Sequence, residues 1–472
     1  MKNILTVFTA FLFINLSAQK TTDYLNKIDH SDITFDGIVL DEEIQGASQI
    51  DLKYETSPGY NIQVKRSTIA YISYTENYLY IGIKAQRDQV ISNIINRDDW
   101  AIYNGDVIAM ASSPTYDPNE FVHGIKRKSW QELINHRDRP LTNKAIAGLY
   151  PPGSTIKTIV ALSALENDIA NTKKKVLCKG SIELYGEKFH CWKKKGHGIM
   201  NMRTGIKRSC DVYFYEVARR LGVDRLSETA KKFGLGKRVL QDFSEERSGV
   251  VPNTSWKKKY IGQNWYLGET LHSGIGQGYF QSTPIQLCLM TAQIANGGFE
   301  IKPRILFDKT KNNLKEYLKF KNENPGQPLP ADLLVSNFDL KPLFKNQENI
   351  KIIKDAMYAS SNEPGGTSYR SRLEDKRFTF AGKTGSSQIR KFTEAQREAE
   401  VKQEQLKYEN RDHALFIAFA PVNDPKYAIS VVVEHGGTGS SAAAPIAKKV
   451  IKKVLERHSL RQSINSLPGD PI

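Results

Sequence analysis

The sequence predicts an α+β fold for most of the chain, preceded by a segment of strands alone. From residue 105 to about residue 461, helical and strand patterns alternate, and no internal repeat is present. Before residue 105, β-prone residues alternate about short polar turns. The length of 472 residues, with 40% hydrophobic and 25% charged residues, is typical of a globular protein of two or three domains. The composition therefore excludes a chain that is disordered throughout.

The N-terminus has the pattern of a secretory signal. Lys2 precedes an apolar run from Ile4 to Leu16, and Leu16-Ser17-Ala18 provides small residues for cleavage. This run is shorter than the about 20 residues that a membrane-spanning helix needs. We expect residues 1–18 to be a cleaved signal peptide, with an uncleaved anchor as the alternative. The protein is then exported, to the periplasm or the outer face of the cytoplasmic membrane.

Residues 19–104 have the pattern of a β segment. The stretch TIAYISYTENYLYIGIKAQ, residues 68–86, alternates β-prone residues about the polar turn Thr75-Glu76-Asn77, which predicts a hairpin. With Asp36-Gly37 before it and Arg97-Asp98-Asp99-Trp100 after it, the segment resembles the first half of a family 9 carbohydrate-binding module. That resemblance implies a β-sandwich. Because the second half does not follow, we expect only a partial one.

The net charge of +16 arises from 67 basic and 51 acidic residues. No stacking-aromatic or zinc-finger pattern accompanies this charge, so nucleic acid is not expected as a partner. Much of the excess lies in short lysine runs at residues 173–175, 193–195 and 257–259. We interpret these runs as solvated surface lysines near an anionic cell envelope.

A serine followed by a lysine one helical turn later begins a strong helix pattern. In YPPGSTIKTIVALSALE, residues 151–153 interrupt the chain, and apolar residues then recur at helical spacing. Ser154 thus stands at a helix N-terminus, with Lys157 on the same face. The lysine can accept the hydroxyl proton, and the helix N-terminus supports developing negative charge. A second match, Ser255 to Lys258, has no apolar helix behind it, so this motif alone is weak evidence.

Two further motifs follow in chain order. Ser209-Cys210-Asp211 precedes VYFYEVARRLG, the pattern of an apolar helix, and Lys383-Thr384-Gly385-Ser386 follows the strand-like RFTFAG. Ser-x-x-Lys, then Ser-x-acid or amide, then Lys-Thr-Gly, is the motif set of β-lactamases and penicillin-binding proteins. The stretches PLTNKAIAGLYPPGS, GIGQGYFQSTPIQL, DHALFIAFAP and YAISVVVEHGG also resemble the scaffold of that family. From Val107 onward the chain is most similar to class B penicillin-binding proteins of the elongation type, the penicillin-binding protein 2 subgroup, through SEERSGVVPNTSW, NWYLGET and Asp211.

This resemblance implies a fold and an activity. The fold is an antiparallel five-stranded sheet flanked by helices over residues 105–461, with a polar tail at residues 462–472. The activity is that of a peptidoglycan D,D-transpeptidase, which cross-links stem peptides in cell-wall synthesis and supports cell shape. Such proteins are acylated by penicillin and other β-lactams. A glycosyltransferase of the elongation machinery is the partner that the resemblance implies.

The resemblance also implies catalytic roles. Ser154 attacks the carbonyl of the penultimate D-alanine of a stem peptide, and Lys157 acts as general base. Ser209 relays a proton to the leaving amine, and Asp211 orients Lys157 and Ser209.

Substrate binding is assigned to the third motif. The resemblance implies that Lys383 and Thr384, followed by Gly385, hold the substrate carboxylate, or that of penicillin. Backbone N–H groups of Ser154 and Ser386 form the oxyanion hole. The acyl transfer itself needs no cofactor.

Other activities stay open at this point. A D,D-carboxypeptidase or β-lactamase-like hydrolase resolves the acyl-enzyme with water, and a β-lactam sensor or glycan-binding protein does not cross-link at all. Class B proteins have a membrane anchor and a long pedestal domain before the transpeptidase domain, whereas here a different pattern precedes Val107. We interpret this as a gene fusion or a misjoined reading frame, in which DWAIYN (residues 99–104) replaces the first strand of the sheet.

Three of the four cysteines cluster in sequence around one histidine. Three thiolates and an imidazole form a closed, tetrahedral zinc site, whereas an exported chain also favours disulfides. The resemblance favours structural zinc, because some relatives carry it here, with one ligand at the middle position of the second motif. His190 is a competing ligand, and Cys288 is expected to be a buried free thiol. The predicted ligands, spaced Cys-x12-Cys-x5-His-x12-Cys, are Cys178, Cys191, His197 and Cys210.

Overall fold

The computed structural model forms two compact units, residues 1–92 with 468–472, and residues 93–467. The predicted signal peptide and residues 99–104 lie outside the residues that the structure describes, as does the tail after residue 465. Among the described residues, no helix is long and apolar enough to cross a membrane. The described residues are 105–122, 124–240, 243–305, 323–324, 342–390, 393, 396–397, 399 and 401–465, with side chains as far as 457, and the backbone of six strands between 26 and 85.

The first unit contains the hairpin that the alternating pattern predicts. Strands β5 (Thr68–Tyr74) and β6 (Leu79–Ala85) pair antiparallel over their whole length. β5 also pairs with β1 (Asn26–Lys27) in parallel and with β2 (Ser48–Asp51) antiparallel, and β3 (Tyr54–Glu55) pairs with β4 (Ile62–Gln63). These strands give one four-stranded sheet and one ribbon. A β-sandwich is not shown by the strands described in this unit.

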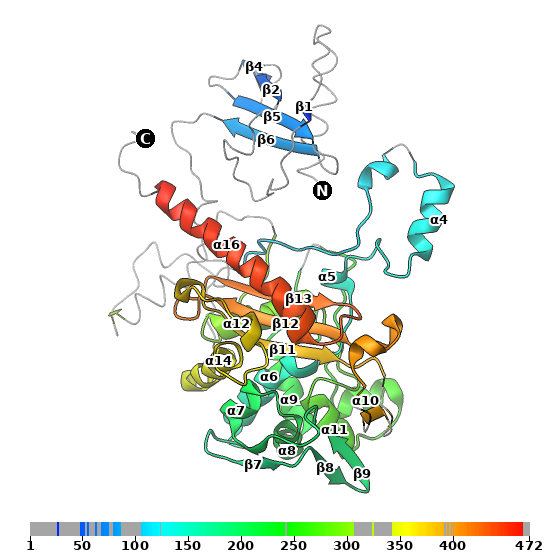
Figure 1. Ribbon diagram of the computed structural model, residues 1–472, viewed down its shortest axis with the longest axis vertical. Coiled ribbons are helices and arrows are strands. Elements are labelled where there is room, and N and C mark those ends of the chain that lie inside the picture. The colour runs from blue at the N-terminus through cyan, green and yellow to red at the C-terminus, as the bar shows by residue number, and fades with distance from the viewer. Residues whose placement is uncertain are drawn as a thin grey trace. The chain divides into compact units, whose positions relative to one another are not determined.

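The second unit is built on an antiparallel sheet in the order β11-β12-β13 (Figure 1). Its strands are β11 (Ala381–Ser387), β12 (His413–Ala420) and β13 (Tyr427–Val433). Within the described part of the chain the sheet therefore has three strands, against the five expected. The strand-like stretch RFTFAG is also corrected. A 3-10 turn, η4 (Lys376–Phe378), occupies its start, and the strand begins only at Ala381.

The two faces of the central strand serve two cores. Leu415, Ile417 and Phe419 pack into the larger core, whereas Phe416 and Ala418 pack into the smaller one. The helices of the larger core include α6 (Lys157–Glu166), α8 (Asp211–Leu221), α12 (Pro284–Ala295) and α14 (Gln347–Asn362), and the smaller core includes α16 (Ala444–Asn465). Because side chains alternate across a strand, β12 must be apolar at almost every position to be buried on both faces. Its sequence HALFIAFA meets that requirement.

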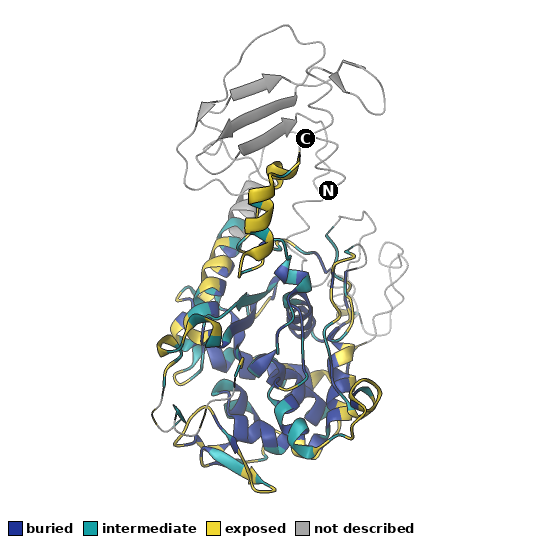
Figure 2. Ribbon diagram, turned by 90° about the vertical axis from the view of Figure 1, so that its right-hand side faces the viewer, coloured by how far each residue is buried: buried dark blue, intermediate teal, exposed yellow. Residues whose placement is uncertain are grey.

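Helices cover both faces of this sheet, and Figure 2 shows the buried residues concentrated among them. α6 is buried along most of its length, which fits its low polarity and its place at the centre of the larger core. The helices are α4 (Arg127–Asn135), α5 (Lys144–Ala147), α6 (Lys157–Glu166), α7 (Met202–Lys207), α8 (Asp211–Leu221), α9 (Val223–Lys232), α10 (Thr254–Ile261), α11 (Leu267–Gly274), α12 (Pro284–Ala295), α14 (Gln347–Asn362) and α16 (Ala444–Asn465).

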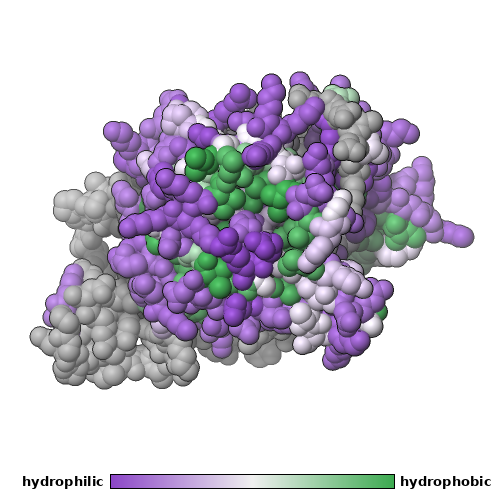
Figure 3. Space-filling view, turned by 90° about the horizontal axis from the view of Figure 1, so that it is seen from below, coloured by the Kyte–Doolittle hydropathy of each residue, from purple (hydrophilic) through white to green (hydrophobic). Residues whose placement is uncertain are grey.

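Two short ribbons precede α7 and form a small lobe. β7 (Val176–Cys178) pairs with β10 (Gly198–Met200), and β8 (Ser181–Leu184) pairs with β9 (Glu187–His190). Leu177 lies opposite Ile199, and both side chains are exposed. The face seen from below in Figure 3 has apolar patches within a hydrophilic surround.

Short helical turns complete the second unit. α16 extends to Asn465, so the helix continues four residues into the predicted tail. The turns are η1 (Pro118–Phe121), η2 (Gly153–Ile156), η3 (Tyr369–Ser371), η4 (Lys376–Phe378), η5 (Gln403–Gln405), η6 (Tyr408–Asn410) and the π-helical η7 (Gly439–Ala443).

Candidate active site

Ser154 lies in the 3-10 turn η2, which runs directly into α6. Such turns are common at helix N-termini because they satisfy backbone groups that the helix leaves unpaired. Gly153 before it has a φ of 53°, and a Cβ there would lie 2.4 Å from the Ser386 carbonyl oxygen. The turn is thus pressed against the end of β11. The half-buried Ser154 hydroxyl makes no hydrogen bond with any described residue.

Lys157 is completely buried at the start of α6. Its Nζ donates to the Asp211 Oδ1 at 2.6 Å, to the Ser209 carbonyl at 3.0 Å and to the Ser209 Oγ at 3.3 Å. A buried ammonium is costly unless charge and hydrogen bonds compensate for its lost hydration. The second motif provides both kinds of compensation. The lysine of the first motif is therefore fixed by the residues of the second.

Ser209 lies just before α8, and Asp211 is the first residue of that helix. Ser209 has a φ of 54°, an uncommon conformation for a residue with a side chain, and such strain is typical of functional sites. The Trp192 backbone N–H donates to the Asp211 Oδ2 at 2.8 Å, and its indole Nε1 donates to the Ser209 carbonyl at 3.1 Å. Sequence reasoning missed Trp192, whose only signal was its position beside Cys191.

Lys383 brings a second buried ammonium to the same hydroxyl. Its Nζ donates to the Ser209 Oγ at 2.9 Å and to the Thr384 carbonyl at 2.9 Å. Burial, together with the nearby Lys157 charge, holds the pKa of Lys383 well below its ordinary value. The Thr384 hydroxyl donates to the Thr367 hydroxyl at 2.8 Å, a partner that the sequence did not single out.

Gly385 and Ser386 continue β11 past the nucleophile. A Cβ on Gly385 would lie 2.9 Å from the Thr155 Cγ2, so glycine allows the turn around Ser154 to approach the strand. The structure thus brings together residues from three distant segments. These are Ser154 and Lys157, then Ser209 and Asp211, then Lys383, Thr384, Gly385 and Ser386.

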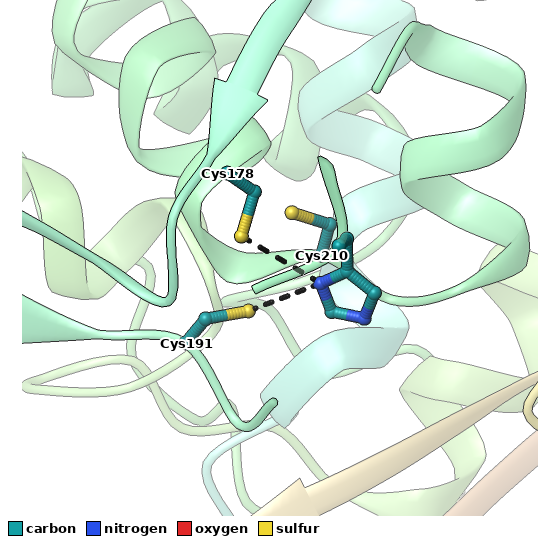
Figure 4. A group of neighbouring side chains, drawn as sticks. Cys178, Cys191 and Cys210 are labelled. Carbon is teal, nitrogen blue, oxygen red and sulfur yellow. Dashed lines mark hydrogen bonds between the residues drawn. The ribbon is translucent and has the colours of Figure 1, made fainter. Parts of the chain in front are cut away.

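The four predicted metal ligands form a second buried cluster next to the first. Their ligand atoms all lie within 4.8 Å of one another, and Figure 4 shows the three thiols, of Cys178, Cys191 and Cys210, turned toward a common point. The His197 Nδ1 is 3.7 Å from the Cys178 Sγ and 3.5 Å from the Cys191 Sγ. Tetrahedral zinc with sulfur and nitrogen ligands places such atoms about 3.4 to 3.8 Å apart. The group, completed by Cys210, could therefore hold a metal ion.

The alternatives for the cysteines are less well matched. All four cysteines are free, and His190 is not among the clustered ligands of the described chain. Hydrogen bonds from Cys210 and His197 lower the pKa of the Cys191 thiol, which favours one thiolate in the cluster. Burial raises the pKa of the Cys178 thiol, and the hydrogen bond to Cys191 together with burial raises that of Cys210. Cys288 is a half-buried thiol, and burial raises its pKa to about 11.

This geometry suits acyl transfer through a serine. A hydroxyl stands at a helix start, a lysine lies one turn away, and a second serine hydroxyl lies within reach of both lysine ammonium groups. Two buried lysines face one carboxylate, Asp211, so a protonated Lys383 can complement a substrate carboxylate.

Comparison with known proteins gives consistent results. The model of the penicillin binding protein transpeptidase domain matches residues 102–452. The peptidoglycan D,D-transpeptidase MrdA of Escherichia coli K12 is 33% identical over 402 residues, which cover 83% of this chain and 59% of that protein. The MrdA of Acinetobacter baumannii is 36% identical over 350 residues, 73% of this chain and 48% of that protein.

Solved structures agree. Pseudomonas aeruginosa PBP2 in complex with WCK 5153 is 37% identical, with a TM-score of 0.61 over 75% of this chain and 69% of that one. Helicobacter pylori PBP2 in complex with MreC is 29% identical, with a TM-score of 0.61 over 83% of this chain and 69% of that one. The chain spans about three-fifths or less of the length of these curated relatives. The matches do not support the resemblance of residues 19–104 to a carbohydrate-binding module. They do establish that the chain belongs to the class B penicillin-binding proteins, as a member similar to PBP2 and MrdA with their α+β transpeptidase fold.

Proposed function

We propose that this chain is a peptidoglycan D,D-transpeptidase in which Ser154 forms the acyl-enzyme. The observation that carries the proposal is the convergence of two buried lysines, a serine and an aspartate beside the turn that contains Ser154. Family membership supports it, because the curated relatives described above are peptidoglycan D,D-transpeptidases. We assign the transpeptidase domain to residues 105–461.

In the proposed reaction, Lys157 acts in its neutral amine form. The Ser154 oxygen bonds to the carbonyl carbon of the penultimate D-alanine, and the Lys157 amine accepts the hydroxyl proton and becomes an ammonium. The Ser209 hydroxyl, in contact with both lysines, passes a proton to the departing D-alanine amine as the C–N bond breaks. The amine of a second stem peptide then attacks the ester carbonyl. That amine loses a proton, Ser154 regains one, and the new peptide bond joins the two stems.

The third motif is assigned to binding. Lys383 and Thr384 hold the substrate carboxylate, with Gly385 keeping the strand close to the nucleophile. The amides of Ser154 and Ser386 bind the oxyanion of the tetrahedral intermediate. Penicillin enters by the same route, because it carries a carboxylate beside an acylating carbonyl.

We also propose zinc as the ion of the Cys3His group. Three thiolates with one imidazole form a closed donor set that favours zinc over harder cations. Bound there, zinc supplies a structural cross-link between the β7–β10 ribbon and the first turn of α8. We propose an exported protein whose partners include a glycosyltransferase and elongation proteins. The solved complex of Helicobacter pylori PBP2 with MreC supports the proposal of elongation proteins as partners.

The activity is tested by the fate of the acyl group. The full chain is incubated with a donor peptide that ends in D-alanyl-D-alanine. The incubation is done with and without an acceptor peptide that carries the side-chain amine of a stem peptide. A transpeptidase releases D-alanine and forms the cross-linked product, and Ser154→Ala does neither. Release of D-alanine without any amine product would instead indicate a carboxypeptidase. Rapid turnover of a β-lactam would indicate a β-lactamase.

A further inference from the structure

The loop after α11 contacts both the turn that contains Ser154 and the end of β11. The Gly153 N–H donates to the Gly276 carbonyl at 2.9 Å. Gly276 has a φ of 72°, and a Cβ there would lie 2.2 Å from the Gly153 carbonyl oxygen. Only glycine allows this approach. The loop therefore supports the nucleophile turn from one side.

Gln277 extends the same loop to β11. Its side chain is only 8% exposed, and its Nε2 donates to the Ser386 carbonyl at 3.0 Å. Gly153 lies against the same residue, since a Cβ on it would be 2.4 Å from the Ser386 oxygen and 3.1 Å from the Ser386 nitrogen. Two separate segments, the loop after α11 and the turn that contains Ser154, thus converge on the backbone of Ser386 in β11.

The direction of the Ser386 backbone follows from strand geometry. In a β-strand, the N–H and C=O of one residue point toward the same edge. The Ser386 carbonyl points to Gln277 and Gly153, away from Ala414, its partner in β12. The Ser386 N–H therefore also points toward the nucleophile turn. An oxyanion held by this N–H would lie near the negative end of the Ser386 carbonyl dipole.

We infer that Gln277 is a positioning residue for the oxyanion hole, an inference that rests on the proposed acyl transfer. Its amide fixes the orientation of the Ser386 peptide groups. It also offsets the partial negative charge of a carbonyl that would otherwise oppose the developing oxyanion. Because this charge develops only after binding, Gln277 should affect the acylation rate constant and leave the initial non-covalent affinity for penicillin almost unchanged.

The test compares variants of the full chain by stopped-flow acylation with a fluorescent penicillin. Gln277→Met keeps the size of the side chain and removes the donor. We expect its acylation rate constant to fall at least about tenfold, against the 10²–10³-fold cost of losing an oxyanion donor outright. The dissociation constant of the non-covalent complex should change less than about twofold. Affinity for a boronic acid, which forms a tetrahedral adduct on the serine, should fall in parallel with the rate constant.

Asn362→Leu is the matched control. The Asn362 side-chain amide donates to the Phe380 carbonyl at 2.8 Å. Phe380 directly precedes the first residue of β11, at the end of the strand opposite to Ser386. This variant should lower the melting temperature with little change in the acylation rate constant. Gln277→Glu adds a rescue, because a protonated carboxyl can donate to the Ser386 carbonyl and a carboxylate cannot. Its acylation, relative to wild type, should recover as the pH falls.

The outcomes are distinct. If wild type is acylated and Gln277→Met keeps its rate constant within twofold, the inference is wrong and the proposed function stands. An equal loss in Asn362→Leu would also overturn it, because the effect would then be general destabilisation of β11. If Gln277→Met does not fold, the pH dependence of Gln277→Glu decides, and its absence counts against the inference. Labelling that survives Ser154→Ala would instead refute the proposed function itself.

Discussion

Two buried polar clusters meet at the first turn of α8, and they are assembled in opposite ways. The lysine cluster draws Lys157, Ser209, Asp211 and Lys383 from three segments that are far apart in sequence. The thiol cluster draws its members from the single stretch 178–210. The lysine cluster contains a strong ion pair, with a Lys157–Asp211 distance of 2.6 Å. The thiol cluster offers four donor atoms and no cation among its own members.

This difference predicts a one-way dependence. Cys210 lies between Ser209 and Asp211, and Trp192, next to Cys191, donates to Asp211. Disturbing the thiol cluster should therefore move the second catalytic motif. The thiol ligands, in contrast, belong to local ribbons and the start of α8, so changes to the lysine side chains should leave metal binding intact.

The largest effect should come from Lys157→Met. Without the general base, we expect acylation by penicillin to slow by about 10³-fold, within the range for general-base catalysis. The unpaired Asp211 carboxylate should also cost about 3–5 kcal/mol of stability, because it stays buried. Adding Asp211→Asn should restore most of the stability and none of the acylation. Denaturant unfolding measures the stability, labelling kinetics measure the acylation rate, and metal analysis measures the zinc content. A lower zinc content in Lys157→Met than in wild type would contradict the one-way dependence.

Removal of the metal is the converse experiment. We expect about one zinc per chain as purified, and chelation or Cys191→Ser should reduce the stability by several kcal/mol, because metal binding is coupled to folding. Acylation should fall about tenfold through displacement of Asp211. Cys288→Ser, which removes the thiol outside the cluster, should do neither. A metal-free protein with two disulfides, or full acylation after chelation, would refute this part of the account.

The pH profile tests the charge of the lysine cluster. Burial and the neighbouring Lys157 lower the pKa of Lys383, while Asp211 opposes that shift. Only the protonated form binds a carboxylate, so the second-order acylation rate should decline as pH rises through a value well below 10.5. A penicillin whose carboxylate is esterified should lack this decline. If both compounds show the same alkaline limb, Lys383 does not bind the carboxylate.

The smallest expected effect is that of Trp192→Phe. It removes the indole donor, which the Arg208 and Ser209 carbonyls share at 3.1 Å each, and keeps an aromatic ring near His197. A neutral hydrogen bond contributes about 0.5–1.5 kcal/mol, so acylation should fall about two- to tenfold. Trp265→Phe loses a bond of the same kind, to the Thr270 hydroxyl at 2.8 Å, and should leave acylation unchanged. Equal effects of the two variants would remove Trp192 from the link between the clusters.

The local parts of both clusters could be predicted from the sequence, and the long-range parts could not. The spacing of Ser154 and Lys157 follows from helix geometry, and the Cys3His group follows from its spacing within one stretch. The contacts of Trp192 with Asp211 and of Thr367 with Thr384 depend on tertiary packing, which leaves no periodic signal. The sheet shows the same limit. The apolar run of β12 marks a buried strand, but the start of β11 was placed too early, because Phe378 and Phe380 mimic strand alternation while a 3-10 turn occupies that stretch.

The most direct test of the central claim is to locate the penicilloyl group on the full chain by mass spectrometry. Trypsin cleavage after Lys144 and Lys157 yields the peptide of residues 145–157, which contains Ser154. The account predicts that penicillin adds to this peptide, with fragmentation assigning the adduct to Ser154. The peptide of residues 248–257, which contains the second Ser-x-x-Lys serine, Ser255, should stay unmodified. An adduct on Ser255, or labelling that persists in Ser154→Ala, would contradict the account.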